Sequence, residues 1–390
     1  MPEESSPVDE AVRKGTCEEW MEKEGIPIYE SPVGVEDVKE LPRGPWARLG
    51  GRGTFIQTEG TKESGAVLYV VEIPAGGSLE PEKHLYDELI YILRGRGSAE
   101  VWHEGEGKRS FEWGEGSLFA MPTNAWHRLV NGGREPALFL SKTNALTVMT
   151  TFRNADFVFN CDYKFTDRFA GQTDYFTDVK RSREELAGGE TRGTLWQTNF
   201  VPDARAVTGD YLSNWKVEGG KQVYFRMASW QGIHSSEYPV GKHHKAHYGN
   251  GSGAVLLGLV SQGYSLIWNK KYGVHPFQDG HGDEVIKFDW KPGGIYCSGA
   301  GANQAWFHCH YNTGPEVARQ LALKNNTDVL SKRRAQFGNL RDGDEPGRPI
   351  EYEDEDPEIR RIFEEECRKN GAESTMPPVV YRTDPFPYSF

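Results

Sequence analysis

The sequence predicts an all-β protein that contains two copies of one antiparallel β-domain. The first observation is a repeated pattern in which Phe-acid-Trp and a Gly precede a His that stands four residues before an Asn. These positions are Phe111, Trp113, Gly116, His127 and Asn131 in the first copy, and Phe288, Trp290, Gly293, His308 and Asn312 in the second. The second observation is that Gly, Pro or Asn interrupts short apolar runs about every ten residues, as antiparallel barrels and sandwiches require.

Length and composition set the limits of this interpretation. The 390 residues suffice for two domains that each bury a core. A formal charge of −12 is unfavourable for binding nucleic acid, because few cations are available to neutralise phosphates. The sequence contains no run of about 18 apolar residues, so we expect no membrane span. The N-terminus lacks the pattern of a signal peptide, and five scattered cysteines are typical of reduced thiols, so we expect a cytoplasmic protein.

The apolar runs predict the strands of the first copy in order. Ala66–Ile73 is largely apolar and ends at Pro74, and Leu89–Leu93, Ser98–Trp102 and Ser117–Met121 follow between turn residues. Beyond the repeats, Arg181–Ala187 and Pro357–Lys369 have helical patterns. We therefore expect five segments: an N-terminal helical arm (1–44), a first domain (45–150), an inter-domain segment (151–221), a second domain (222–325) and a C-terminal extension (326–390). The aromatic tail from 376 to 390 is expected to pack on a domain or on another subunit.

At the end of the first copy the sequence resembles the cupin superfamily. The second cupin motif, G-x5-P-x-G-x2-H-x3-N, fits Gly116, Pro122, His127 and Asn131. Asn124 stands where the motif has Gly, which is acceptable in a turn that requires left-handed backbone.

The first cupin motif, G-x5-H-x-H-x3-E-x6-G, fits from Gly76 to Gly95, with a carboxylate in place of one His. The ligand set that the resemblance implies is Glu82, His84, Glu88 and His127. Residues 82, 84 and 88 share strand parity, so their side chains would face the barrel interior. A carboxylate buried there needs a partner, and two imidazoles with one or two carboxylates suit Fe(II), Mn(II), Ni(II) or Zn(II).

The second copy replaces the acids with histidines. His243 and His247 repeat the four-residue interval of His84 and Glu88, whereas His244 would face outward from a regular strand. On the closing strand, His308 and His310 share one face, and Cys309 between them would face the other. The candidate ligands of this copy are therefore His243, His247, His308 and His310, and three-His iron sites occur in cupin dioxygenases. A surface patch of histidines is the alternative interpretation.

The resemblance implies a double cupin: two jelly-roll β-barrels with a short N-terminal helix and a helical C-terminal extension. It also implies a divalent metal, Fe(II) first, and a dioxygenase that acts on a small aromatic or enolisable acid, similar to the gentisate-type bicupin dioxygenases. A manganese-dependent carboxy-lyase of bicupin type and a non-catalytic accessory protein that binds a small molecule are the alternatives. Such proteins often form homo-oligomers, which we expect here. The better ligand spacing favours the first barrel as the metal site.

Overall fold

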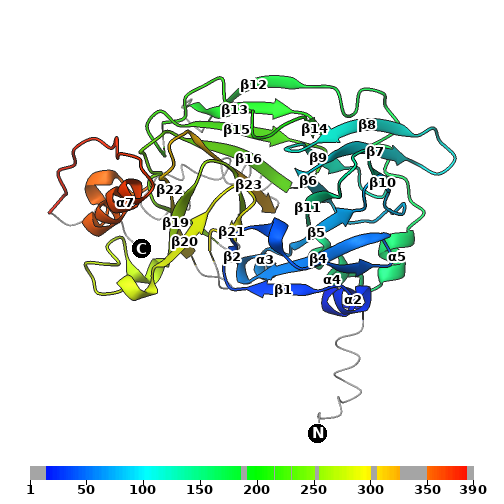
Figure 1. Ribbon diagram of the computed structural model, residues 1–390, viewed down its shortest axis with the longest axis horizontal. Coiled ribbons are helices and arrows are strands. Elements are labelled where there is room, and N and C mark those ends of the chain that lie inside the picture. Colours follow the sequence, from blue (N-terminus) through cyan, green and yellow to red (C-terminus); the bar gives the residue numbers. More distant parts are fainter. Residues whose placement is uncertain are drawn as a thin grey trace, which may run out of the picture.

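The computed structural model describes residues 15–185, 191–214, 216–229, 231–250, 254–299, 305–325 and 349–383. Each half of the molecule is made of two facing, mainly antiparallel sheets with jelly-roll strand order, and the halves lie side by side (Figure 1). We call them the first and second barrels. The predicted all-β class and the doubled domain are confirmed. Among the described residues, the model contains no helix with the length and apolar character needed to cross a membrane.

The first barrel combines an eight-stranded sheet, in the order β1-β4-β5-β11-β6-β9-β14 with β3 paired to β4, and a three-stranded sheet, β10-β7-β8. Its strands are β1 (Ile28–Ser31), β3 (Gly44–Trp46), β4 (Gly51–Thr58), β5 (Val67–Ile73), β6 (Glu88–Arg94), β7 (Arg96–Trp102), β8 (Arg109–Gly114), β9 (Leu118–Met121), β10 (Trp126–Asn131), β11 (Ala137–Thr143) and β14 (Phe200–Val201).

The second barrel combines an eight-stranded sheet, β12-β13-β15-β16-β23-β18-β21-β2, and a four-stranded sheet, β17-β22-β19-β20. Its strands are β2 (Gly34–Val35), β12 (Lys180–Glu185), β13 (Thr191–Gln197), β15 (Lys221–Arg226), β16 (Gln231–Tyr238), β17 (His247–Asn250), β18 (Val255–Val260), β19 (Gly263–Asn269), β20 (Ile286–Trp290), β21 (Ile295–Cys297), β22 (Ala305–Asn312) and β23 (Ala318–Asn325).

Helices lie outside the sheets. They are α2 (Cys17–Glu24), α3 (Glu59–Ser64), α4 (Ala145–Phe152), α5 (Ala155–Asn160) and α7 (Pro357–Lys369), with 3₁₀ turns η1 (Val38–Glu40), η2 (Lys270–Tyr272), η3 (Gly282–Glu284) and η4 (Tyr352–Asp354). Of these, α2, α3, α5 and α7 each begin at a residue whose side chain caps a backbone amide. The helix predicted for 357–369 is confirmed, because Asp356 caps the Glu358 amide and Pro357 occupies the first turn. The predicted helical arm (1–44) contains α2 but also β1, β2 and η1, and its residues 1–14 lie outside the described residues.

The predicted helix at 181–187 is wrong where the structure describes it. Residues 180–185 form β12, which pairs with β13, and Arg181 stacks over the Trp196 ring at 4.0 Å. Helix propensity is a weak determinant compared with tertiary contacts, so pairing with an available sheet edge decides the conformation.

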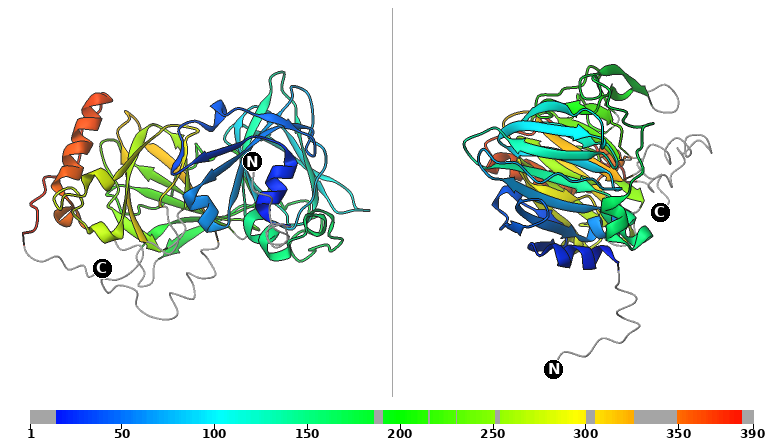
Figure 2. Two further views of the ribbon diagram at one scale, coloured as in Figure 1. Left: turned by 90° about the horizontal axis from the view of Figure 1, so that it is seen from below. Right: turned by 90° about the vertical axis from the view of Figure 1, so that its right-hand side faces the viewer.

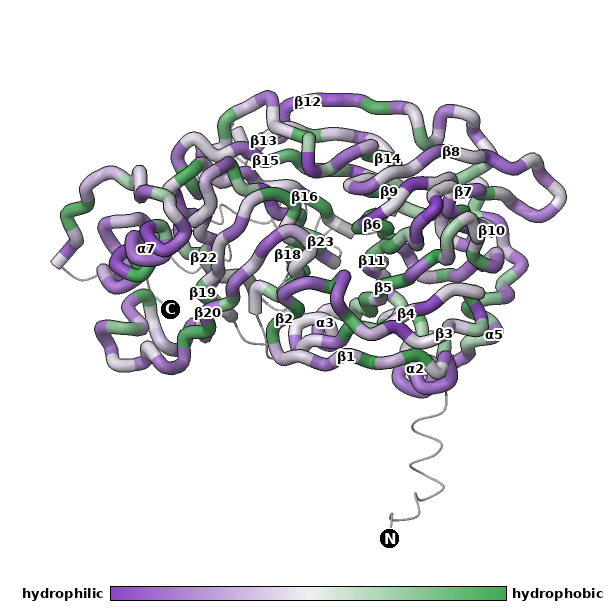
Figure 3. The backbone as a smooth tube through the Cα atoms, in the orientation of Figure 1, coloured by the Kyte–Doolittle hydropathy of each residue, from purple (hydrophilic) through white to green (hydrophobic). Residues whose placement is uncertain are grey.

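The two large sheets share a core, and this explains why the predicted strands are apolar on both sides. On β5, Tyr69 and Val71 face the interior of the first barrel, whereas Leu68 and Val70 face the second barrel. Leu257 of β18 and Leu321 of β23 complete this shared core from the second barrel. A strand covered on both faces reads as a continuous apolar run. Figure 3 shows hydrophobic stretches along many strands, whereas α2 and α7 are largely hydrophilic.

Each barrel also takes a strand from a neighbouring segment. β2, in the N-terminal arm, pairs with β21 of the second barrel. β14, from the segment between the barrels, pairs with β9 of the first. These exchanges and the shared core tie the two barrels together.

The duplication extends to individual contacts of the repeated Asn. Asn131 Nδ2 donates to the carbonyls of Ile73, Pro74 and Glu135, and its Oδ1 accepts from the Gly133 amide. Asn312 makes the corresponding contacts with the carbonyls of Tyr238, Pro239 and Glu316 and with the Gly314 amide. The Asn of the repeat therefore fixes the same corner in both barrels.

Gly97 and Gly263 show the same equivalence at the start of β7 and β19. Each pairs with the repeated Trp on one side and with the repeated Asn on the other. A Cβ would lie 1.9 Å from the Val130 oxygen at Gly97 and 1.8 Å from the Tyr311 oxygen at Gly263. The repeated glycines are therefore needed for close strand approach.

Asn131→Ala should destabilise the first barrel by about 2 kcal/mol or more, because it leaves buried carbonyls without their donor. Urea unfolding followed by tryptophan fluorescence measures this change. Asn160→Ala is the matched control, since Asn160 makes an exposed hydrogen bond to Asp156 on α5, and it should change stability by less than about 0.5 kcal/mol. Equal stability of the two variants would contradict the structural role of the repeated Asn.

Candidate metal centre

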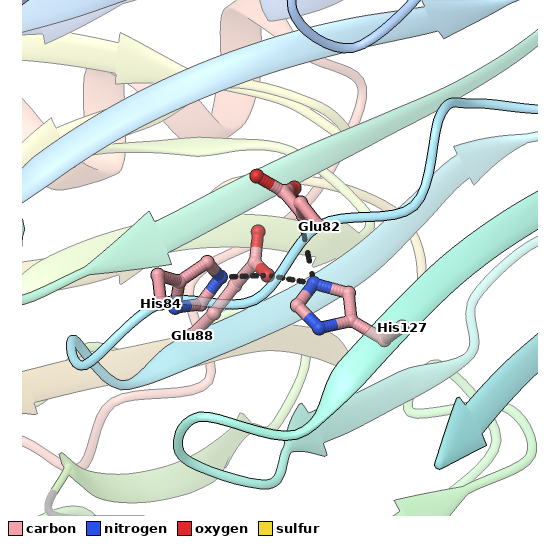
Figure 4. Close-up of side chains that lie close together, drawn as sticks. All are labelled: Glu82, His84, Glu88 and His127. Atoms are coloured by element: carbon pink, nitrogen blue, oxygen red, sulfur yellow. Dashed lines mark hydrogen bonds and ion pairs between the residues drawn. The ribbon is translucent and has the colours of Figure 1, made fainter. Parts of the chain in front are cut away.

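Four side chains converge at one end of the first barrel: Glu82, His84, Glu88 and His127 (Figure 4). Glu88 is the first residue of β6 and shares the interior face with Ile90 and Ile92. His127 lies on β10 opposite Glu82, and their backbones exchange two hydrogen bonds of 2.8 and 2.9 Å. The structure thus brings together all four residues of the first predicted set.

The turn between the last two ligands follows the sequence prediction. Asn124 has a left-handed φ of 56°, in the position where the cupin motif has Gly. Its amide donates to the His84 carbonyl at 2.9 Å, which links the turn to the segment carrying His84. The Asn side chain tolerates this backbone better than most residues do.

The ligand atoms of the cluster lie within 4.8 Å of one another. Glu88 Oε2 is 3.3 Å from His84 Nε2 and 3.4 Å from His127 Nε2. Glu82 Oε1 is 3.8 Å from His127 Nε2. Side chains of His84, Glu88 and His127 are at most 3% exposed, whereas Glu82 is 12% exposed. The cluster is therefore closed on the Glu88 side and reaches toward solvent beside Glu82.

Both imidazoles are oriented by backbone carbonyls. His84 Nδ1 donates to the Tyr86 carbonyl at 2.8 Å, and His127 Nδ1 donates to the Ala125 carbonyl at 3.1 Å. This orients each ring so that its Nε2 faces Glu88, where it can donate a proton to the carboxylate or, once deprotonated, offer a lone pair to a cation. His127 Nε2 is buried and has no hydrogen-bond partner. Two imidazole lone pairs and a carboxylate that face one another leave room for a cation, so the donor set fits a divalent metal.

The electrostatics of the cluster agree with this interpretation. Burial opposes a negative charge on Glu88, yet the imidazoles of His127 and His84 hold the pKa of this carboxyl well below its usual value. Burial likewise lowers the pKa of His127, but Glu88 and Glu82 raise it above its usual value overall. The site therefore favours a carboxylate with positive charge beside it, which a metal ion also supplies.

A second layer of side chains holds the ligands in place. Glu88 Oε1 accepts from Tyr69 Oη at 2.6 Å and from Ser141 Oγ. The Tyr86 ring stacks on His84 at 3.7 Å between centroids. Such outer contacts orient metal ligands and strengthen their binding.

Arg48 is the functional candidate that sequence reasoning missed. Its Nη1 donates to Glu82, and its Nε donates to Glu24 of α2 at 2.8 Å. Although burial lowers the pKa of Arg48, Glu82 raises it overall, so the guanidinium stays charged. Arg48 follows the short β3 far from both motifs, and no spacing in the sequence connects it with Glu82.

Comparison with known proteins agrees with the fold of this barrel. Residues 69–142 match the family model described as "Cupin domain". This segment includes His84, Glu88 and His127, which the structure brings together. The first barrel is therefore a cupin domain. Because the second barrel repeats the topology and register of the first, the chain has a double-cupin fold.

Solved structures with a similar arrangement are distant in sequence. The coconut allergen cocosin is 11% identical, with a TM-score of 0.47 over 75% of this chain and 85% of its own. A mutant of Bacillus subtilis oxalate decarboxylase is 12% identical, with a TM-score of 0.45 over 80% of this chain and 85% of its own. An 11S globulin from Wrightia tinctoria is 10% identical, with a TM-score of 0.47 over 77% and 87%. No curated protein sequence matched the chain.

The second cupin barrel does not repeat the ligand set of the first. His247 pairs with His308 as Glu82 pairs with His127, so His247 replaces Glu82. Gly249, two residues later, then replaces His84. Ala254 replaces Glu88. Its carbonyl accepts from the Ser298 amide at 3.1 Å, and this pair corresponds to the pair of Glu88 and Met121 in the first barrel. Only two of the four ligand positions therefore carry histidine in this barrel.

The predicted alignment of His243 and His247 with His84 and Glu88 is therefore wrong. His243 bridges Tyr311 and faces away from the interior, and His244 faces inward, opposite to the prediction. The reason is that β17 begins only at His247, so strand parity does not extend through the preceding segment. The structure separates His243 from His247, His308 and His310.

The interior of the second barrel contains four neighbouring imidazoles. Ring centroids of His247 and His308 are 4.2 Å apart, and those of His308 and His310 are 5.4 Å apart. His244 lies 4.8 Å from His247, and Lys216 Nζ is 2.9 Å from His247 Nε2. Burial, followed by Lys216, lowers the pKa of His308 to about 3. Neutral imidazoles beside a lysine make this interior different in charge from the acid-containing first site.

Glu88→Ala and His127→Ala should each reduce metal affinity by about tenfold or more, because each removes a ligand. Metal analysis of protein purified without chelators, followed by titration with Fe(II) and Mn(II), measures this loss. His103→Gln is the matched control, since His103 is buried in the same barrel but donates to the Phe169 carbonyl. Unchanged affinity in both ligand variants would place the metal elsewhere.

Proposed function

We propose that this bicupin is a metal-dependent oxygenase whose reaction occurs in the first barrel, with Fe(II) as its metal and a small aromatic or enolisable acid as its substrate. The observation that carries this proposal is the convergence of two imidazole Nε2 atoms and the Glu88 carboxylate. Two histidines and one carboxylate on one face are typical of non-haem Fe(II) oxygenases. The gentisate-type dioxygenases remain the proposed model for the reaction.

Each protein group would have a definite role. His84, His127 and Glu88 would hold the metal, and Glu82 would be a fourth ligand that can be displaced, since it is the most exposed of the four. When bound, the metal supplies a redox-active centre at which substrate oxygens and O₂ meet. The rings of Tyr86, Trp20 and Phe159 pack together behind His84 and exclude water from that side. The open side is therefore the one beside Glu82 and Arg48.

Arg48 supports an acid as the substrate. Its guanidinium contacts Glu82 at the edge of the cluster, and its side chain is 25% exposed. Trp46 and Phe159 lie against it at 5.4 and 4.6 Å, which limits its movement. A guanidinium in this position can bind a substrate carboxylate while the rest of the substrate reaches the metal.

A manganese-dependent carboxy-lyase is the second candidate, and the Arg48–Glu82 ion pair favours it. If Glu82 stays paired with Arg48, it is an ionised carboxylate beside the metal that can accept a proton and later return it. Loss of CO₂ from a small acid needs such a group. Mn(II) accepts the same nitrogen and oxygen ligands.

The second barrel is proposed to have a supporting role. His247, His308 and His310 remain a proposed all-histidine metal site. Separately, we propose that the protein forms homo-oligomers. A non-catalytic protein that binds a small molecule is the outcome left if neither reaction is found.

Oxygen uptake distinguishes these functions. Fe(II)-loaded protein should consume O₂ with a catechol, a gentisate-like hydroquinone or a β-dicarbonyl acid. His127→Ala should abolish this uptake, because it removes a ligand, and His308→Ala should retain most of it. The reverse pattern would place the reaction in the second barrel. Release of CO₂ without O₂ consumption in the Mn(II)-loaded protein would favour the lyase, and tight binding without turnover would favour the accessory protein.

Arg48→Met should raise KM for an acidic substrate by about tenfold or more with a smaller change in kcat, because one charged hydrogen bond is lost on binding. Arg48→Lys should recover part of this loss, since it keeps the charge but not the planar fork. Arg43→Met is the control, because Arg43 lies on the same segment and pairs with Glu72. Metal content should stay unchanged in all three proteins. A KM equal to that of the wild type would exclude Arg48 from substrate binding.

A further inference from the structure

A second group of metal-ligating side chains lies on the outer face of the second barrel. His243, Cys309 and Glu355 offer one ligand atom each, and these atoms lie within 4.8 Å of one another. His243 Nε2 is 3.5 Å from Glu355 Oε2, and Cys309 Sγ is 3.7 Å from His243 Nδ1. All three residues are buried. The three groups come from different parts of the chain: the segment before β17, the strand β22 and the junction of η4 with α7.

The position of these residues follows from strand alternation on β22. His308 and His310 face the barrel interior, so Cys309 and Tyr311 face the opposite side. There they join the core that Phe363 and Cys367 of α7 form on the sheet. His243 pairs with Tyr311 in an isolated antiparallel β-bridge, so its side chain lies on the same outer side. Figure 2 shows α7 at the end of the molecule, beside the strands of the second barrel.

Glu355 is an unusual carboxylate in this position. Its side chain is 3% exposed, and its Oε1 has no hydrogen-bond partner. Its neighbours are satisfied differently: Asp354 pairs with Arg382, and Asp356 accepts from the amides of Phe277, Gln278 and Glu358. A buried carboxylate without a donor costs free energy unless a cation or a proton compensates it.

His243 has the orientation of a metal ligand. Its Nδ1 donates to the His244 carbonyl at 3.1 Å, which leaves Nε2 as an acceptor that faces Glu355. The Tyr352 hydroxyl donates to the His243 carbonyl at 2.7 Å, and the Tyr311 ring stacks on the imidazole at 5.0 Å. When one ring nitrogen of a histidine binds a metal, the other usually donates to a carbonyl or carboxylate, which fixes the orientation of the ring.

We infer that His243, Cys309 and Glu355 bind a Zn(II) ion that fastens the C-terminal extension to the second barrel. Thiolate, imidazole and carboxylate are the three side-chain types that bind zinc in proteins. One thiolate and one carboxylate neutralise the charge of a divalent cation, so the complete site can be buried without net charge.

The first barrel lacks this site, which indicates that it belongs to the extension and not to the repeat. By register, Ser78 stands where the second barrel has His243, and Arg128 stands where it has Cys309. The outer face of β10 carries partly exposed Trp126, Arg128 and Val130. The three ligands therefore occur together only where η4 and α7 cover the sheet. A metal here would join residues that are separated by more than forty positions in the chain.

Cobalt substitution tests the site without depending on activity. Protein freed of metal and loaded with Co(II) should show a thiolate-to-cobalt charge-transfer band, because Cys309 is a ligand here whereas the first cluster contains no cysteine. Cys309→Ser should abolish the band and reduce Zn(II) affinity by about tenfold or more. Cys367→Ser is the matched control, since Cys367 is buried in the same core on α7, and it should keep the band. No band in the wild-type protein would overturn the inference even if Cys309→Ser fails to fold.

Zinc analysis separates this site from the first barrel. A Glu88→Ala, His127→Ala double variant should still bind Zn(II), and adding Glu355→Gln should lower its zinc content by one ion per chain. Hydrogen exchange across residues 349–376 should become faster when zinc is removed from the wild type, because the extension loses its attachment. Zinc content that does not respond to Glu355→Gln, or exchange that does not respond to zinc, would contradict the site.

Discussion

The register of the closing strand in each barrel determines which side chains can meet. On β10 and β22, successive residues face opposite sides of the sheet, so a shift by one residue would exchange interior and exterior groups. The repeated Asn fixes that register, because its side chain holds three carbonyls and one amide in both barrels. With Asn131 and Asn312 held, His127 and His308 must face inward. The first ligand cluster, the imidazoles of the second barrel and the exterior position of Cys309 all depend on this constraint.

The buried carboxylate Glu88 shows how the fold and the site depend on each other. A barrel interior can contain an acid only if cations or donors compensate it. Here Tyr69 and Ser141 satisfy one carboxylate oxygen, and two imidazoles face the other. In the second barrel the same position is Ala254, which belongs to the apolar core. The second barrel has no acid at this position and contains several imidazoles, so the two interiors differ in charge although they share one topology.

The sequence predicted the features that a local pattern controls. The repeat, the four strands of the first copy, α7 and the left-handed turn at Asn124 were predicted correctly, because each follows from apolar runs, capping residues or turn chemistry. The set of Glu82, His84, Glu88 and His127 follows from motif spacing, and the structure places them together. Residues 181–185 were predicted wrongly, since pairing with β13 outweighs helix propensity. The sequence predicted that His243 faces inward and His244 outward, whereas the structure has the opposite, because the irregular segment before β17 does not preserve strand parity.

Contacts between distant segments were beyond the reach of any local pattern. Arg48 meets Glu82 and Glu24 only because β3, α2 and the loop before β6 pack at one edge of the first barrel. Glu355 meets His243 only because the extension covers the outer face of β22. In both places a charged group without a motif lies beside a residue that a motif identifies. The outer face of the repeat is partly exposed in the first barrel and covered in the second, so the covering segment places Glu355 beside Cys309 of β22. The same strand, β22, therefore presents histidines to the barrel interior and a cysteine to the added layer, and alternation keeps these two environments separate.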